Sequence, residues 1–175
     1  MDEDLKAING KNPTAGLMKN ALPPGVTSSV TSDEFDDAGW RNPLFAMSYA
    51  VARKRKAKDW FTGVALAKDV VGPDHEIQIH HVFPKAILKE AGVRKKDRDE
   101  IANLAFLGAR PNRQISMREP SKYLAEIAQK HPDRLEAQSI PMDRKLWKVA
   151  RFQDFLAARR ELLAVAVNDL LADPV

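Results

Sequence analysis

The segment DHEIQIHHVFP constrains the fold of this chain more than any other. Ile77 and Ile79 alternate with polar residues, and this period of two predicts a β-strand over residues 74–81. Pro84 follows closely and ends the strand, because proline has no backbone N–H to donate to a neighbouring strand.

Most of the remaining sequence has helical spacing. Asn42 and Pro43 match an N-cap followed by a proline at the first helical position. Helices are predicted over residues 43–58, 85–92, 120–130 and 141–172, and a second strand over residues 101–108. The predicted core face of the last helix consists of Phe152, Phe155, Leu156, Leu162, Leu163, Ala166, Leu170 and Leu171. These patterns predict a mainly α-helical fold with a small β element.

Length and composition exclude several classes of protein. A chain of 175 residues has room for one sizeable core with an appended arm. It has no cysteine, which excludes disulfides, cysteine-bound zinc and thiol catalysis. The candidate imidazole ligands are its four histidines: His75, His80, His81 and His131. The sequence contains no apolar run of bilayer length, and its acidic N-terminus lacks a signal-peptide pattern, so we expect a cytoplasmic protein without membrane partners.

Charge is distributed unevenly along the chain. Residues 1–40 carry seven acidic and three basic side chains, a net charge of −4, and are rich in Pro, Gly, Ser and Thr. They are predicted to form an acidic arm or linker. Residues 41–175 carry a net charge of +8, which favours a polyanionic partner. A solvated surface with excess lysine explains the same charge equally well.

The adjacent histidines His80 and His81 end the first predicted strand, and neighbouring strand residues point to opposite faces. Asn103 begins the run NLAFLG of the second strand, and Asn112 follows nine residues later at a predicted helix start. This order of strand, loop, strand and helix resembles the ββα-metal core of the HNH (His-Asn-His) endonucleases. The strings HHVFPKAIL, NLAFLGARPNRQIS and PSKYLAEI more specifically resemble the C-terminal nuclease domain of GmrSD-type modification-dependent restriction proteins.

The resemblance covers about residues 41–172 and implies an α+β fold, mainly helical, with an embedded ββα-metal core over about residues 74–130. It implies a restriction or phage-defence nuclease that hydrolyses DNA phosphodiesters. The nucleotide-dependent N-terminal domain of such proteins carries an Asp-Gly-Gln-Gln-Arg signature, which is missing here. We therefore expect either an excised nuclease domain or a standalone relative, with the sensor domain as a separate or missing partner.

Site roles follow from the resemblance, residue by residue. His81 corresponds to the general base that activates water. Asn103 corresponds to the middle asparagine, which is counted with the catalytic residues because it braces the loop and so orients His81. His80 and Asn112 correspond to the metal ligands. Ser116 stands one helical turn after Asn112, where some family members carry another histidine, and offers possible support to the site. Plainer interpretations remain: incidental histidines, a turn residue at Asn103 and a helix cap at Asn112.

The implied cofactor is a divalent metal, with Mg²⁺ or Mn²⁺ expected in the cell and Zn²⁺ or Ni²⁺ able to bind in vitro. Basic residues near the motif are predicted to contact DNA phosphates, although each is also an ordinary surface cation. They are Lys85, Arg110, Arg113, Arg118 and Lys122. Two rival functions stay open at this point. One is a catalytically silent DNA- or protein-binding module, and the other is an RNA nuclease.

Overall fold

A computed structural model describes residues 29–66, 77–108 and 118–173. Its helices and strands, in chain order, are η1 (Ser32–Phe35), α3 (Pro43–Lys54), β1 (Ile77–His81), α4 (Lys85–Glu90), α5 (Lys95–Arg98), η2 (Ile101–Asn103), β2 (Leu104–Gly108), α7 (Pro120–Lys130), α8 (Pro132–Glu136), η3 (Arg144–Trp147), η4 (Val149–Arg151) and α9 (Phe152–Ala172). The elements labelled η are short 3₁₀-helices. The fold is mainly helical with one small sheet, as the sequence patterns predict.

The sheet consists of β1 and β2, which pair antiparallel. The register sets Ile77 opposite Gly108 at one end and His81 opposite Leu104 at the other. Side chains directly opposite in a ladder share one face. His81 and Leu104 therefore lie on one face of the hairpin, while His80 lies on the other.

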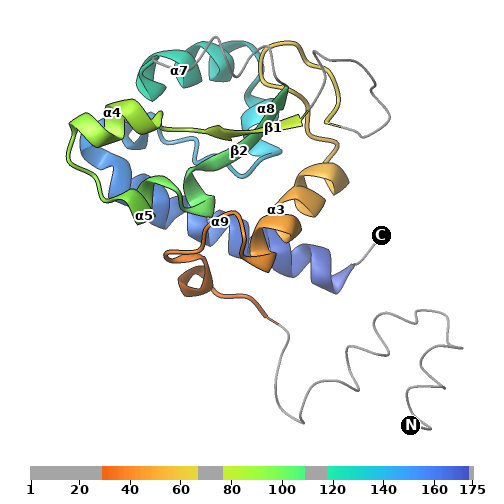
Figure 1. Ribbon diagram of the computed structural model, residues 1–175. Coiled ribbons are helices and arrows are strands. Elements are labelled where there is room, and N and C mark those ends of the chain that lie inside the picture. Colours follow the sequence, from red (N-terminus) through yellow and green to blue (C-terminus); the bar gives the residue numbers. More distant parts are fainter. Residues whose placement is uncertain (1–28, 67–76, 109–117, 174–175) are drawn as a thin grey trace, which may run out of the picture.

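The two faces of the hairpin are covered by different helices. On the His81 face, Phe106 packs against Phe45 and Tyr49 of α3, with ring centroids 5.3 and 5.0 Å apart. On the His80 face lies Tyr123 of α7. In Figure 1 the hairpin lies between α7 at the top and α9 below.

Helix α9 supplies much of the apolar core. Its buried residues recur every three or four positions, which is the spacing of one helix face. They are Phe152, Phe155, Leu156, Arg159, Leu163, Ala164, Ala166 and Val167. Leu162, predicted as a core residue, is exposed instead, because it lies at the edge of this stripe. None of the described helices is long and apolar enough to cross a membrane.

A charged residue, Arg159, lies in the middle of the buried stripe of α9. Its guanidinium donates to the carbonyl oxygens of Ala102 at 2.9 Å and Gln138 at 3.2 Å. These bonds connect α9 to the segment just before β2 and to the turn after α8. Burial lowers the pKa of Arg159, so the hydrogen bonds are needed to offset lost hydration.

Several element boundaries differ from the sequence predictions. Helix α3 has the predicted Asn42 cap, whose side chain accepts from the Leu44 N–H at 2.9 Å. It ends at Lys54, however, because Lys56 adopts a left-handed backbone with φ of 53° that no helix continues through. The predicted last helix begins only at Phe152, and two 3₁₀-turns precede it. Residues 101–103 are also 3₁₀ rather than strand.

The described part of the predicted arm, residues 29–40, belongs to the folded body. Phe35 is fully buried in the main core, and Ala38 is buried beside it. The Val30 backbone exchanges two hydrogen bonds with the Asn168 side chain of α9, at 2.7 and 2.8 Å. These contacts pack residues 30–38 against the body, as expected of an arm that lies on it.

Candidate functional site

His80 and His81 face opposite sides of β1 and have different surroundings. His80 is 3% exposed. Its ring meets the rings of Trp60 and Tyr123 edge-on, with centroids 6.0 and 6.3 Å away. This aromatic packing fixes the orientation of the imidazole. The His81 side chain is 23% exposed and borders an open pocket.

Asn103 holds the chain segment that follows His81. Its amide oxygen accepts from the Phe83 N–H at 2.8 Å, and its amide nitrogen donates to the carbonyls of Phe83 at 3.2 Å and Arg98 at 2.9 Å. Its own carbonyl accepts from the Val82 N–H at 2.8 Å. Asn103 is fully buried, so these bonds have no competition from solvent. The side chain thus clamps two segments 20 residues apart in sequence.

A second clamp comes from α7, and the sequence reasoning missed it. The Tyr123 hydroxyl donates to the Val82 carbonyl at 2.5 Å. Burial raises the pKa of Tyr123, which keeps the phenol protonated as a donor. The carbonyl and the N–H of Val82 are therefore both held, one by Tyr123 and one by Asn103. The helical spacing of α7 could have identified Tyr123 as a core residue, but not its partner.

Two charged residues lie beside His81. Oδ1 of Asp99 is 3.4 Å from Nε2 of His81 and 2.5 Å from Nζ of Lys85. Burial, helped by the positive charge of Lys85, lowers the pKa of His81 to about 4, although Asp99 opposes the shift. Burial would raise the pKa of Asp99, but the hydrogen bond and charge of Lys85 hold it below its usual value. Near neutral pH the site therefore combines a neutral imidazole, a carboxylate and an ammonium.

The pocket beside His81 has a volume of about 520 Å³. Its walls are formed by Gly39, Trp40, Arg41, Asn42, Ile79, His81, Lys85, Asp99 and Leu104. No site residue was predicted in the segment 39–42, although Asn42 was predicted as the cap of α3. Backbone bonds hold it in place, since Ala38 accepts from the Ile101 N–H at 2.7 Å and Gly39 pairs with Glu100. Trp40, Arg41 and Asp99 thus join His81 through contacts that no local pattern predicts.

Three of the remaining predicted site residues are described by the structure. Lys85 lines the pocket. Arg118 pairs with Glu126 at 2.6 Å, and Lys122 pairs with Glu119 at 3.6 Å, at the start of α7 and in its first turns. The other predicted ligand and phosphate contacts lie outside the described residues. They are Asn112, Ser116, Arg110 and Arg113. The predicted meeting of His80 with Asn112 is therefore neither shown nor contradicted.

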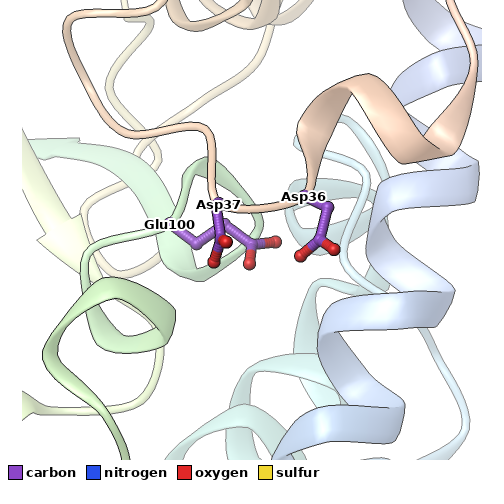
Figure 2. Close-up of side chains that lie close together, drawn as sticks. All are labelled: Asp36, Asp37 and Glu100. Atoms are coloured by element: carbon purple, nitrogen blue, oxygen red, sulfur yellow. The ribbon is translucent and has the colours of Figure 1, made fainter.

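A cluster of carboxylates adjoins the pocket wall, since its buried Glu100 follows Asp99 and pairs with Gly39. Asp36, Asp37 and Glu100 have oxygen atoms within 4.8 Å of one another (Figure 2). Arg160 bonds both Glu100 and Asp36 at 2.7 Å, and Lys96 pairs with Asp37. Burial raises the pKa of Glu100, although Arg160 opposes the shift. Two of the protein's own cations pair with the three carboxylates, so the cluster forms an ion-pair network within the described residues.

Comparisons with protein-family models, curated proteins and solved structures found no match to this chain. Its function must therefore be argued from the residues and geometry described above.

Proposed function

We propose that this protein is a metal-dependent DNA endonuclease of the HNH type, which hydrolyses phosphodiester bonds. The observation that carries the proposal is the position of His81. Its imidazole borders an open pocket beside Lys85 and Asp99, and burial lowers its pKa, which favours the neutral form. A neutral imidazole can accept a proton from water, and a cation beside it can attract a phosphate.

The arrangement around His81 supports the same proposal. The two strands pair antiparallel and α7 packs on one face of them, while the helix start proposed at Asn112 lies outside the described residues. His80 and His81 end the first strand, and Asn103 comes directly before the second. In an HNH nuclease the middle asparagine braces the loop that carries the base. The bonds from Asn103 to Phe83 are of the kind that this role requires.

In the proposed reaction, His81 takes a proton from the water that attacks phosphorus. The Asp99 carboxylate lies near Nε2 and favours a proton there, which leaves Nδ1 as the acceptor. Lys85 neutralises charge on the phosphate. Asn103 and Tyr123 act as positioning residues, because they hold the backbone at residues 82 and 83. The products would carry 5′-phosphate and 3′-hydroxyl ends.

His80 and Asn112 are the residues proposed to hold a divalent metal. The His80 ring is 3% exposed and packs edge-on against Trp60 and Tyr123, with centroids 6.0 and 6.3 Å away. An imidazole nitrogen and an amide oxygen suit Mg²⁺ or Mn²⁺ and leave positions for phosphate oxygens. When bound, the metal supplies Lewis-acid activation of the phosphate. By resemblance to GmrSD-type proteins, we assign the nuclease to restriction or phage defence.

The test is nicking of supercoiled plasmid with Mg²⁺ or Mn²⁺. We expect wild type to nick, His81→Ala to lose activity and His131→Ala to keep it, since His131 caps α7 away from the pocket. Absence of nicking with every divalent metal, or equal nicking by His81→Ala, would overturn the proposal. Plasmid binding without cleavage would favour the silent binding module. Faster cleavage of RNA than of DNA would instead make the protein a ribonuclease.

A further inference from the structure

Trp40 is unusual among the tryptophans of this protein. Trp60 and Trp147 are each 1% exposed, whereas Trp40 is 53% exposed. Among the described residues, four large hydrophobic side chains are exposed: Trp40, Ile79, Leu162 and Val165. Two of the four, Trp40 and Ile79, line the pocket beside His81. Exposed apolar surface concentrated at one pocket marks a binding site more often than scattered apolar residues do.

The surroundings of Trp40 indicate the chemistry of what binds. The guanidinium of Arg41 lies over the indole ring, 4.5 Å from its centroid, so the ring already accepts a flat, delocalised partner. Ile79 and Leu104 add apolar surface, and Lys85 adds a cation near His81. An aromatic plane beside cations suits a nucleotide, whose base stacks while its phosphate pairs with an ammonium. The volume of about 520 Å³ lies within the usual range for small-ligand pockets.

Backbone hydrogen bonds hold the turn at residues 39–42, which carries Trp40. Residue 39 pairs with residue 100, and Asn42 donates its N–H to the Gly39 carbonyl at 2.9 Å. Trp40 lies in this turn, with Asp99 in the neighbouring segment of the same pocket wall. A hydrogen-bonded turn therefore holds Trp40 in the wall of the pocket that His81 also lines.

We propose that this pocket receives an unpaired nucleobase next to the phosphate to be cut, with Trp40 as its stacking surface. The inference rests on the proposed nuclease function and names its substrate class: DNA that is single-stranded or locally unpaired at the cut. A base inside a duplex has both faces covered by neighbouring base pairs. It can stack on Trp40 only after leaving the helix, which costs a few kcal/mol in paired DNA and least where the base is already unpaired.

Binding of a short labelled oligodeoxynucleotide in EDTA tests the inference without cleavage. We expect wild type to bind the single strand more tightly than the matched duplex. Trp40→Ala should weaken single-strand binding roughly 5- to 100-fold, since stacking of one base is worth that much. Trp40→Phe should keep most of the affinity, because an aromatic plane remains. Val165→Ala, which shortens another exposed apolar side chain, is the matched control and should bind like wild type.

Equal binding by Trp40→Ala and wild type, or equal wild-type affinity for single strand and duplex, would overturn the inference. Different results would overturn the nuclease proposal. These are wild type that cuts no DNA with any metal, or His81→Ala that cuts as fast as wild type, and neither depends on the oligonucleotide binding. Cleavage of a duplex with a central unpaired bubble faster than of the fully paired duplex, with the difference lost in Trp40→Ala, would support both.

Discussion

His80 and His81 are neighbours in sequence, yet they occupy opposite environments. The His80 ring is packed among Trp60 and Tyr123 and is almost fully buried, whereas His81 borders an open pocket with Lys85 and Asp99. The cause is the pleat of β1, which sends adjacent side chains to opposite faces. The comparison teaches that one short strand can carry a buried imidazole packed among aromatic rings and a partly exposed imidazole that borders a pocket. Variants on either face should therefore behave differently.

Replacement of His81 should lower the cleavage rate more than the other changes and should leave the stability nearly unchanged. His81→Ala should lower the cleavage rate by about 100- to 10,000-fold, the usual contribution of a general base. Its unfolding free energy should change by less than about 1 kcal/mol, because the side chain is partly exposed. Plasmid nicking and urea unfolding measure the two quantities. A variant that loses stability as well would break the distinction between the two faces.

Replacement of Asn103 should affect both faces, because its side chain holds the segment after the histidine pair. Asn103→Ala leaves three buried backbone groups of Phe83 and Arg98 without their partner, so we expect a loss of about 3 kcal/mol in urea unfolding. Nicking should fall even where the variant is folded. The control is Asn42→Ala, which removes a helix cap and should cost about 1 kcal/mol. Equal losses in the two variants would mean that Asn103 is an ordinary turn residue.

Replacement of His80 tests the buried face directly. His80→Ala leaves a cavity beside Trp60 and Tyr123, and we expect a stability loss of about 2 kcal/mol. Nicking should be lost too, because His80 is a proposed ligand of the metal. Denaturant unfolding of His80→Ala and His81→Ala, run side by side, provides the comparison. If His80→Ala is as stable as His81→Ala, the aromatic packing does not support the fold.

The smallest effect is expected from the Tyr123 hydroxyl. Tyr123→Phe keeps the ring beside His80 but removes the hydrogen bond to the Val82 carbonyl. We therefore expect the free energy of unfolding to fall by about 1 kcal/mol. Tyr49→Phe, at a partly buried tyrosine of α3, serves as the control and should change thermal stability less. A larger loss from Tyr49→Phe would contradict the clamp assigned to Tyr123.

Local patterns predicted much of the fold because their causes are local. Helix α7 spans the predicted residues 120–130, and Asn42 caps α3 as expected. The hairpin strands also lie where alternation and apolar runs place them, although β2 begins at Leu104 instead of residue 101. The end of α3 was missed because the left-handed Lys56 has no sequence signal. Helical spacing predicted Leu162 as buried, but it lies at the edge of the buried stripe and is exposed. The same spacing did not predict that the charged Arg159 is buried.

The candidate site was predicted only in part. The histidine pair, Asn103 and Lys85 came from the motif and its surroundings, and the structure brings His81 and Lys85 to one pocket. Asp99, Trp40 and Arg41 were not predicted as site residues. Their positions depend on pairing between residues 38–39 and 100–101, more than 60 positions apart. No periodicity encodes a contact over such a distance.

The sequence by itself determined a mainly helical chain with one hairpin, a histidine pair at a strand end and no cysteine chemistry, because alternation, capping and composition act over a few residues. The tertiary structure decided which histidine is buried among aromatic rings, and which shares a pocket with Trp40, Lys85 and Asp99. It also decided the protonation of His81, since that depends on burial and on the charge of Lys85. Burial and charge proximity arise only when distant segments pack together.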